Sequence, residues 1–429
     1  MTFAPGKHPR SANSANRGEF STRDTRAADV SLQGGWPAHE HAVVPWRQSG
    51  RHGSREDRTL REITVSLPPS IANLDFHVDA ELAGVINTAI RDVLAVDADP
   101  RSHIRAFGAL LLRTESVASS RIEHVDASME DYARAVAGIR ANESATSMVA
   151  ATVALGQMIV RAGEHGVIRL EDILGAHAIL MADDPIDRGY AGTLRDVQNW
   201  IGGSDHSPLR AVHLPPPPKT VDGYMADLIA FANRDDLDPI TQAAIAHAQF
   251  ESIHPFTDGN GRIGRAVINA IWRRRGLTSK TVVPVASAML AERDRYFDLV
   301  NRYRLGEVRE FILDTASGAS IAATEAATSA ERLALLPDAW LEVSKPRRGS
   351  AAAKVLGILA EHPILSAEEA QELTGAPLSS VYTAMDRLAD DGIIHQVTDR
   401  QRNRVWGATD ILDELDDLAA RIGDRVRSR

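Results

Sequence analysis

Apolar residues recur at helical spacing along most of this chain. Between residues 79 and 96 they form the stripe Leu82, Val85, Ile86, Ile90 and Leu94. This spacing places them on one face of a helix. Comparable patterns predict further helices over residues 131–139, 144–161, 170–181, 221–234, 238–252, 263–272, 284–303 and 307–335. The chain is therefore predicted to be mainly α-helical.

The helical period breaks between residues 189 and 218. Glycines there precede a short apolar segment and the four consecutive prolines 215–218. Extended segments separated by turn residues favour a β-hairpin. A run of prolines alone could also serve as a polyproline ligand for a partner domain. Residues 63–69 are a second short extended piece, which ends at two prolines.

The N-terminal segment through residue 62 has little periodicity and is rich in Ser, Arg, Gly, His and Pro. Such a composition predicts disorder. The alternative is a basic arm that contacts nucleic acid or a partner through Arg51, Arg55, Arg58 and Arg61. Glu56 and Asp57 dilute that positive charge, which favours the inert interpretation.

The pattern beyond residue 345 predicts a small separate domain. Residues 345–350 are a basic, Gly- and Pro-containing linker, followed by helices over 351–361, 366–374 and 378–391. Two extended segments, 393–397 and 404–407, follow these helices. This order resembles a winged helix-turn-helix. On DNA its contacts would come from residues of the third helix and the wing, namely Ser379, Ser380, Tyr382, Thr383, Arg400, Arg402 and Arg404.

Acidic residues around the same helices support the alternative of a protein-interaction or self-association module. The whole chain has a formal net charge of −10, which argues against general coating of nucleic acid. Its 429 residues exceed one compact domain, and it has no cysteine for a disulfide or a thiolate metal site. We find no apolar run that predicts a membrane span and no signal-peptide core, so a cytoplasmic location is expected.

The candidate chemistry lies in residues 254–265, with the sequence HPFTDGNGRIGR. Gly259 and Gly261 allow a tight turn whose amides can surround an anion at the start of the next helix. Arg262 and Arg265 are three positions apart, so both project from one face of that helix. Two guanidinium groups beside such an amide nest suit a polyphosphate.

Two further side chains extend this interpretation to a reaction. Asp258 is a hard oxygen ligand that can hold Mg²⁺ against phosphates. His254 can be neutral near pH 7 and accept a proton. Together these groups indicate nucleotidyl transfer. The glycines also match the dinucleotide fingerprint, but an Ala-rich helical pattern precedes them and no acidic residue occurs between Arg265 and Ala291.

The same twelve residues resemble the signature of Fic-domain proteins, with all eight specified positions present. The resemblance implies a helical Fic core and transfer of AMP from ATP to a Ser, Thr or Tyr hydroxyl of a protein. It implies His254 as the general base and Asp258 as the ligand of Mg²⁺, with Mn²⁺ as an alternative. The ATP-binding residues would be Phe256 as a core anchor, Thr257, Gly259, Asn260 and Gly261 in the anion hole, Arg262, Arg265, and Tyr296 near the adenine.

A second segment resembles the inhibitory helix of the family. Residues 115–124 contain Ser119 and Glu123 four positions apart, on one face of a predicted helix. The resemblance implies that Glu123 pairs with Arg265 and takes the place of the γ-phosphate. Position 124 is His, where the family pattern has Gly or Asn. Without the resemblance, Glu123 would be an ordinary solvated side chain of an exposed helix.

The resemblance also assigns the zone before the motif. Residues 192–218 would form the flap, a hairpin that docks a target polypeptide by strand addition. The identity of the target is open, and self-modification and a homodimer are compatible with the family. Alternatives are removal of AMP by hydrolysis at the same site, kinase-like transfer of the terminal phosphate, and a DNA-binding regulator controlled by its Fic domain.

These interpretations divide the chain into five parts. We expect a disordered arm over residues 1–62, a Fic-associated region over 63–100 and a Fic core over 101–340. A linker over 341–350 and a winged helix-turn-helix over 351–429 complete the chain.

Overall fold

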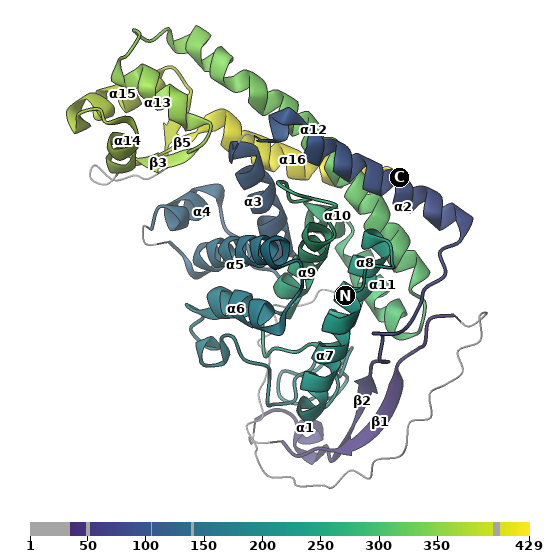
Figure 1. Cartoon of the computed structure of the whole chain (residues 1–429). Helices are drawn as coiled ribbons and strands as arrows, with labels where there is room; N and C mark the ends of the chain where they lie inside the picture. Colours follow the sequence, from purple (N-terminus) through teal and green to yellow (C-terminus); the bar gives the residue numbers. More distant parts are fainter. Residues whose placement is uncertain (1–34, 49–51, 104, 139–140, 398–403) are drawn as a thin grey trace.

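The computed structural model of the protein describes residues 35–48, 52–103, 105–138, 141–397 and 404–429. Its described part is mostly helical, with two small sheets at opposite ends (Figure 1). This arrangement confirms the predicted mainly α fold.

The centre of the molecule is the antiparallel pair α8 (Pro239–Ile253) and α9 (Asn260–Arg274). Every residue of α8 from Ile240 to Ile253 is buried, and small alanines let neighbouring helices approach closely. A helix that is covered on all sides belongs to a core. The predicted start at residue 263 was three residues late, because Gly259 begins α9 in a left-handed conformation.

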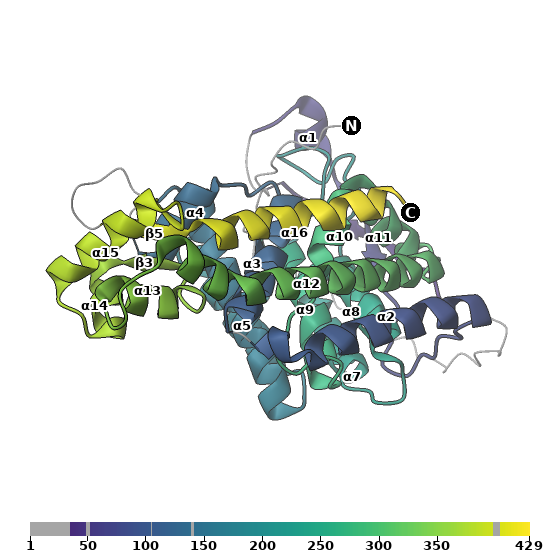
Figure 2. The ribbon, with the colours of Figure 1, turned by 90° about the horizontal axis from the view of Figure 1, so that it is seen from above.

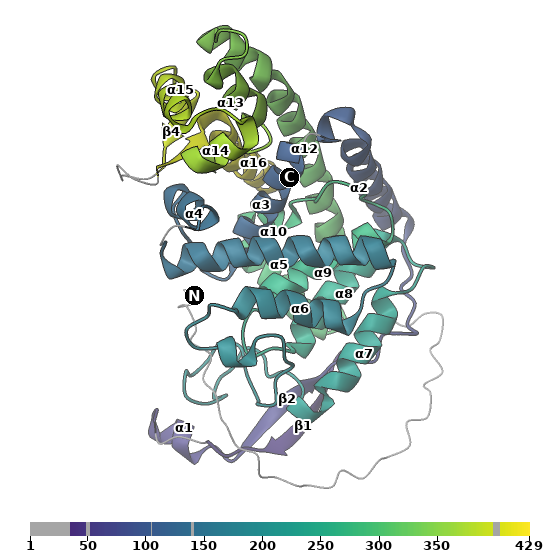
Figure 3. The same cartoon turned by 60° about the vertical axis from the view of Figure 1, so that its left-hand side comes forward.

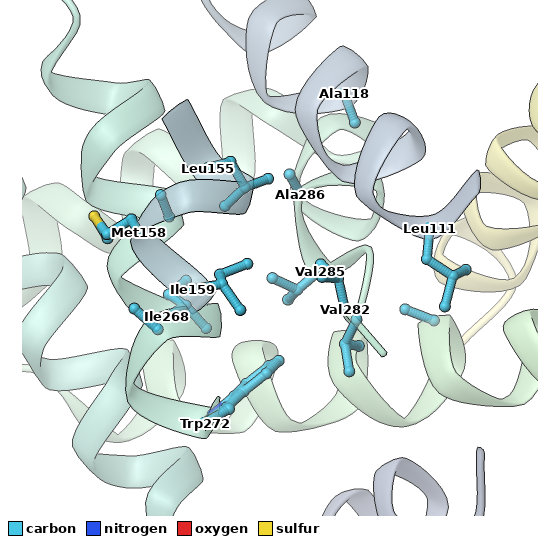
Figure 4. Packing of buried hydrophobic residues seen from close by; sticks show 14 of the residues in the cluster. Leu111, Ala118, Leu155, Met158, Ile159, Ile268, Trp272, Val282, Val285 and Ala286 are labelled. Atoms are coloured by element: carbon cyan, nitrogen blue, oxygen red, sulfur yellow. The ribbon is translucent and has the colours of Figure 1, made fainter. Parts of the chain in front are cut away.

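Helices α5 (Glu143–His165) and α6 (Leu170–Met181) cover one side of this pair (Figure 3). Met158 and Ile159 of α5 lie beside Ile268 of α9, and Trp272 is fully buried below them (Figure 4). Removing a buried side chain of this size typically costs about 2–5 kcal/mol. The N-cap of α5 is Asn142, whose side chain accepts the amide of Ala145, so the helix begins before the predicted residue 144.

Among the described residues, α5 is also the one helix whose length and apolarity would suffice for a membrane span. By length and composition, the expectation that no apolar run is long enough to span a bilayer was therefore wrong. The helix packs against α6 and α9, as core helices of globular proteins do.

The remaining helices surround the centre. Helix α3 (Arg105–Ile122) contacts α5, α9 and α10 (Val285–Ala291). The other elements of this part are α4 (Met129–Val136), α7 (Val221–Ala232) and α11 (Arg293–Arg304). On the outside, α12 (Arg309–Ser344) lies between α2 (Ala80–Ala98) and α16 (Thr409–Arg427), as the view from above shows (Figure 2).

The C-terminal region consists of three helices and a three-stranded antiparallel sheet of order β3-β5-β4. Its elements are α13 (Ala351–Leu359), β3 (Ile364–Ser366), α14 (Ala367–Thr374), α15 (Leu378–Asp390), β4 (Ile394–Gln396) and β5 (Val405–Ala408). Ser366 caps α14 with a capping box, as its spacing to Glu369 allows. The sequence analysis missed β3 and α16. Assignment of this region as a winged helix-turn-helix stays a prediction.

The predicted linker over 341–350 begins inside a helix, because α12 continues through Ser344. Helix α16 then returns from the C-terminal region to the core and contacts α12, α10 and α3. Its Arg421 donates to Glu325 and Ser329 of α12 and to its own helix's Glu414. The two parts of the chain are therefore packed together rather than joined by the linker alone.

The N-terminal arm differs from its expected disorder. Strands β1 (Glu40–Pro45) and β2 (Glu62–Leu67) form an antiparallel hairpin, and α1 (Arg55–Thr59) lies between them. The hairpin buries Trp46 and Val65 against Trp200 of the flap segment. The prediction of disorder was wrong for these described residues, because the hairpin packs on the flap segment, which lies far along the chain. Residues 1–34 and 49–51 lie outside the described part, so the interpretation of Arg51 is not tested.

Candidate nucleotide-binding site

The motif loop connects α8 to α9, and two left-handed residues shape it. His254 ends α8 with φ 49° and ψ 62°, and Gly259 begins α9 with φ 76°. A side chain at Gly259 would also lie 3.0 Å from Leu180. At this position both the left-handed backbone and the closeness of Leu180 favour glycine. The loop therefore turns sharply and directs the first amides of α9, which have no partner within the helix, toward one point.

The side chain of Asn260 closes this loop from within. Its Oδ1 accepts the amide of Phe256, and its Nδ2 donates to the carbonyl of the same residue. Phe256 is fully buried and anchors the loop in the core, and Thr257 is buried beside it. Asn260 thus holds the loop conformation through its side chain, a contribution that the sequence analysis did not identify.

His254 lies where the flap segment meets the loop. Arg195 donates from Nε to the carbonyl of His254 at 2.8 Å, and its backbone amide donates to the carbonyl of Pro255. Arg195 is buried, and desolvation lowers its pKa to about 9. Asn199 donates to the carbonyl of Phe256. The flap segment is therefore joined to the backbone on both sides of His254.

The flap itself is less regular than expected. Its two arms meet in a single antiparallel bridge between Ile201 and His213, and the structure assigns neither arm a strand longer than that bridge. Instead, Ser66 of β2 donates its amide to the carbonyl of Leu214. The second arm of the flap therefore lies beside the N-terminal hairpin. The four prolines explain the irregularity, because proline has no amide to donate to a sheet.

The two motif arginines project toward different helices. Arg262 donates to Ser147 of α5 at 2.7 Å, and its Nη2 is 3.9 Å from Asp258. Arg265 is 1% exposed and donates to Ser119 Oγ, Ser119 O and Glu123 Oε1, each at 2.8 Å. These three acceptors all belong to α3 or the residue after it. The predicted pairing of Glu123 with Arg265 is present in the structure.

The carboxylate of Glu123 also lies against the loop backbone. A Cβ added to Gly261 would be 1.9 Å from Glu123 Oε1. The carboxylate therefore occupies space directly beside the first turn of α9, where the helix dipole favours an anion. An anionic ligand that needs Arg265 and this turn has to displace it.

Behind Arg265 lies a second group of buried polar side chains. Tyr296 is 2% exposed, and its hydroxyl is 3.0 Å from His247 Nε2 and 3.5 Å from Arg265 Nη1. Burial lowers the pKa of His247 to about 3 and raises the pKa of Glu251 to about 7. The sequence analysis expected Tyr296 near an adenine. The structure describes it as part of this buried group, so the adenine contact stays a prediction.

Asp258 is the one predicted metal ligand. Its side chain is 36% exposed, and its Oδ1 accepts the amide of Gly259 at 2.7 Å. The described residues contain no cluster of three or more acidic, His or Cys side chains that could hold a metal ion. A single accessible carboxylate suits Mg²⁺ that arrives with phosphates, because Mg²⁺ keeps most of its waters and needs few protein ligands.

Among the residues proposed for DNA contact, Ser379, Ser380 and Thr383 are exposed, whereas Arg404 is engaged within the protein. Arg404 pairs with Asp386 at 3.0 Å and lies over the rings of Tyr382 and Trp406. Arg387 of α15 donates to the carbonyl of Ser344. Arg400 and Arg402 lie outside the described residues. Residues 351–429 contain nine Lys and Arg against fourteen Asp and Glu, so electrostatics gives this region little attraction for phosphates.

Fold and site together define a helical domain with a glycine-rich loop and two arginines at a helix start, a combination suited to a polyphosphate. Comparison with known proteins agrees with this class. Residues 167–272 match the model of the Fic/DOC family. The chain therefore contains a Fic domain.

Curated relatives match over the same part of the chain. The protein adenylyltransferase fic-1 of Caenorhabditis briggsae is 33% identical over 153 residues, which make up 35% of this chain and 27% of that protein. The protein adenylyltransferase Fic of Nematostella vectensis is 32% identical over 149 residues, 34% of this chain and 31% of that protein. The chain thus matches less than a third of the length of these relatives.

A solved structure aligns with a larger share of the chain than these relatives do. The crystal structure of a Fic family protein from Desulfovibrio desulfuricans G20 aligns with 78% of this chain and 97% of its own, with a TM-score of 0.51 and 20% sequence identity. At this identity the match concerns the fold alone.

Proposed function

We propose that this protein is an adenylyltransferase that moves AMP from ATP to a hydroxyl group of a protein and that is inhibited at rest by Glu123. The observation that carries the proposal is the position of Glu123. Its carboxylate pairs with Arg265 at 2.8 Å and touches the start of α9. A carboxylate in that place acts as a substitute for a phosphate. This position supports a nucleoside triphosphate as the ligand.

The proposed reaction uses groups of the motif loop. ATP lies with its phosphates along the first turn of α9, and Arg262 and Arg265 neutralise their charge. His254 accepts the proton of a Ser, Thr or Tyr hydroxyl. The hydroxyl oxygen forms a bond to the α-phosphorus, the bond from that phosphorus to the bridging oxygen breaks, and pyrophosphate leaves with the electron pair. Mg²⁺ at Asp258 would stabilise charge on the phosphates when it is bound.

The second substrate is proposed to be a polypeptide that docks on the flap. The flap reaches the backbone of His254 through Arg195 and that of Phe256 through Asn199. A backbone docked along the flap would bring a side chain near His254. The same contacts do not favour any particular target sequence, because strand addition reads the main chain.

His254→Ala tests the role of the base. General base catalysis contributes about 10²–10⁴-fold, so AMP transfer should fall at least about 100-fold while ATP affinity changes little. The assay compares ATP labelled in the α-phosphate with ATP labelled in the γ-phosphate, in a Glu123→Gly background. Label from only the α-phosphate indicates AMP transfer, and label from the γ-phosphate indicates a kinase. His395→Ala, an exposed histidine of β4, is the control. Unchanged transfer by His254→Ala contradicts this role.

Glu123→Gly tests the inhibition. A hydrogen bond to a charged group contributes about 1.5–3 kcal/mol, so its removal should raise self-labelling by roughly ten- to a hundredfold. Glu164→Gly, at an exposed position on α5, controls for the effect of a glycine in a helix. Equal labelling by wild type and Glu123→Gly would remove the inhibitory role.

Removal of AMP from a modified protein is a second candidate for the same site. Glu123 is beside the anion-binding turn and its side chain is 34% exposed, so it can orient a water molecule there. Incubation of an AMP-modified protein with wild type and Glu123→Gly in the presence of Mn²⁺ separates the reactions. Hydrolysis by wild type alone would support this candidate.

A further inference from the structure

His177 of α6 lies between the flap and the motif loop, and nothing in the sequence patterns marked it. Its ring is fully buried and stacks on Phe256, with ring centroids 3.7 Å apart and planes 6° from parallel. Nδ1 lies 3.0 Å from the amide of Gly192, and Nε2 lies 3.1 Å from the carbonyl of Asp258. One side chain therefore contacts the first residue of the flap and the last carbonyl before Gly259.

These contacts fix the tautomer of the ring. The amide of Gly192 is a donor, so Nδ1 has to be the unprotonated acceptor. The proton is then on Nε2, which donates to the carbonyl of Asp258. Burial lowers the pKa of His177 to about 4. A neutral ring with one donor and one acceptor is the form that satisfies both partners.

Each partner of His177 controls a different half of the candidate site. The carbonyl of Asp258 belongs to the peptide that enters the left-handed turn at Gly259, so its orientation sets the direction of the Asp258 carboxylate and of the first amides of α9. Gly192 has φ 72° and precedes Arg195 by three residues. Arg195 in turn holds the backbone of His254. A shift of the loop on ligand binding is thus passed to the flap through the ring of His177.

We propose that His177 is a positioning residue that couples occupancy of the nucleotide loop to the order of the flap. This inference rests on the proposed function and deepens it, because it assigns the link between the two substrates. When phosphates bind at the loop and fix the peptide after Asp258, the donor and acceptor of His177 fix Gly192. The flap is then rigid before a target polypeptide docks on it.

The test compares two substitutions of similar size in the Glu123→Gly background. His177→Phe preserves the stacked ring and removes both hydrogen bonds. His177→Gln keeps a donor and an acceptor in one side chain. Hydrogen exchange is measured for residues 189–199 of the flap and 256–262 of the loop, with and without MgATP.

In the parent protein and in His177→Gln, we expect MgATP to slow exchange in both segments. In His177→Phe, we expect it to slow exchange in the loop while exchange in the flap stays at least about tenfold faster than in the parent. A local structural role alone would change exchange equally with and without nucleotide. The proposal is overturned if MgATP protects the flap as strongly in His177→Phe as in the parent protein. It is also overturned if this protection of the flap is lost in both His177→Phe and His177→Gln.

A variant on the other partner gives an independent measurement. A Cβ at Gly192 would lie 2.9 Å from Cβ of Ala178 and in an unfavourable left-handed conformation. Gly192→Ala should therefore move the amide away from His177 without changing the ring, and reproduce the effect of His177→Phe. Full protection of the flap in Gly192→Ala contradicts the coupling. Absence of AMP transfer together with the expected exchange pattern would reject the transferase proposal and leave the coupling supported.

Discussion

At the residue scale, Arg265 of α9 is held by acceptors from α3 and the residue that follows it. Its guanidinium is buried, so it has to be neutralised by a partner. Glu123 supplies the opposite charge at 2.8 Å, and Ser119 Oγ and Ser119 O accept two further hydrogen bonds from the guanidinium. A phosphate would supply equivalent oxygen acceptors. Exchange between Glu123 and a phosphate therefore involves two favourable states of similar chemistry, and small changes at the end of α3 can shift the balance.

His124 is a residue just beyond the end of α3 whose conformation affects how Glu123 is presented. It follows Glu123 with φ 60°, a left-handed conformation that costs a residue with a side chain about 1–2 kcal/mol. His124→Gly should relieve this strain, stabilise the helix end that presents Glu123, and lower basal self-labelling by roughly five- to thirtyfold. The melting temperature should rise in parallel. Higher labelling by His124→Gly would show that the strain does not oppose inhibition.

At the scale of elements, α3 connects the candidate site to α10. Glu115, Ser119 and Glu123 are spaced by four positions, and all three accept a hydrogen bond from a side chain of α9. Glu115 accepts the amide of Ala286 at 2.7 Å, at the start of α10, and Asn269 of α9 at 3.3 Å. Burial raises the pKa of Glu115 to about 8. The helix is therefore anchored in its middle part by a carboxyl group that is mostly protonated at neutral pH.

This anchor predicts a pH dependence of stability. A carboxyl whose pKa is raised in the folded state binds a proton there that the unfolded state releases near pH 4.5. Its contribution to stability is full below that value and is lost as the pH rises through about 8. Melting temperature should therefore fall between pH 6.5 and 8.5. Glu115→Gln, which is neutral at every pH, should flatten this decline, and an unchanged decline would contradict the role of Glu115.

At the scale of the whole molecule, both ends of the chain return to the Fic domain. The N-terminal hairpin packs on the flap through the edge-to-face pair Trp46 and Trp200, with ring centroids 5.8 Å apart. In the C-terminal region, Val397 and Val405 pack on Ala133 of α4, the helix that follows the inhibitory segment. The flap and α4 are thus each supported by a terminal region of the chain.

Substitution of Asp57 in α1 tests whether the N-terminal region stabilises the flap. It is buried and accepts the hydroxyl of Ser207 at 2.6 Å, besides the amide and hydroxyl of Ser54 at 2.7 Å. Asp57→Ala leaves these donors without a partner, so unfolding free energy should fall by about 1–3 kcal/mol. Hydrogen exchange in residues 201–214 should accelerate. The neighbouring Glu56→Ala removes only an exposed pair with Arg210 and should cost under about 1 kcal/mol. Equal effects of both variants would contradict a specific role for Asp57.

The sequence by itself determined the local features of this protein. The period of apolar residues predicted helices, with α6 matching at Leu170–Met181. The helix predicted over 284–303 is divided into α10 and α11, and α12 continues nine residues beyond the predicted end at 335. The helix predicted over 366–374 begins at its observed cap, Ser366, because a cap acts within three residues. The motif loop was readable for the same reason, since its glycines, base and arginines are adjacent in the chain.

Only the tertiary structure decided which distant residues share the site. Arg265 and Glu123 are 142 positions apart, and His177 and Asp258 are 81 positions apart. No local periodicity encodes such a contact. The resemblance to a family predicted the first pair, whereas nothing predicted the second. The extended piece predicted over residues 63–69 is strand β2, but strand β1 was missed for a related reason, because the hairpin is stabilised by its packing on the flap.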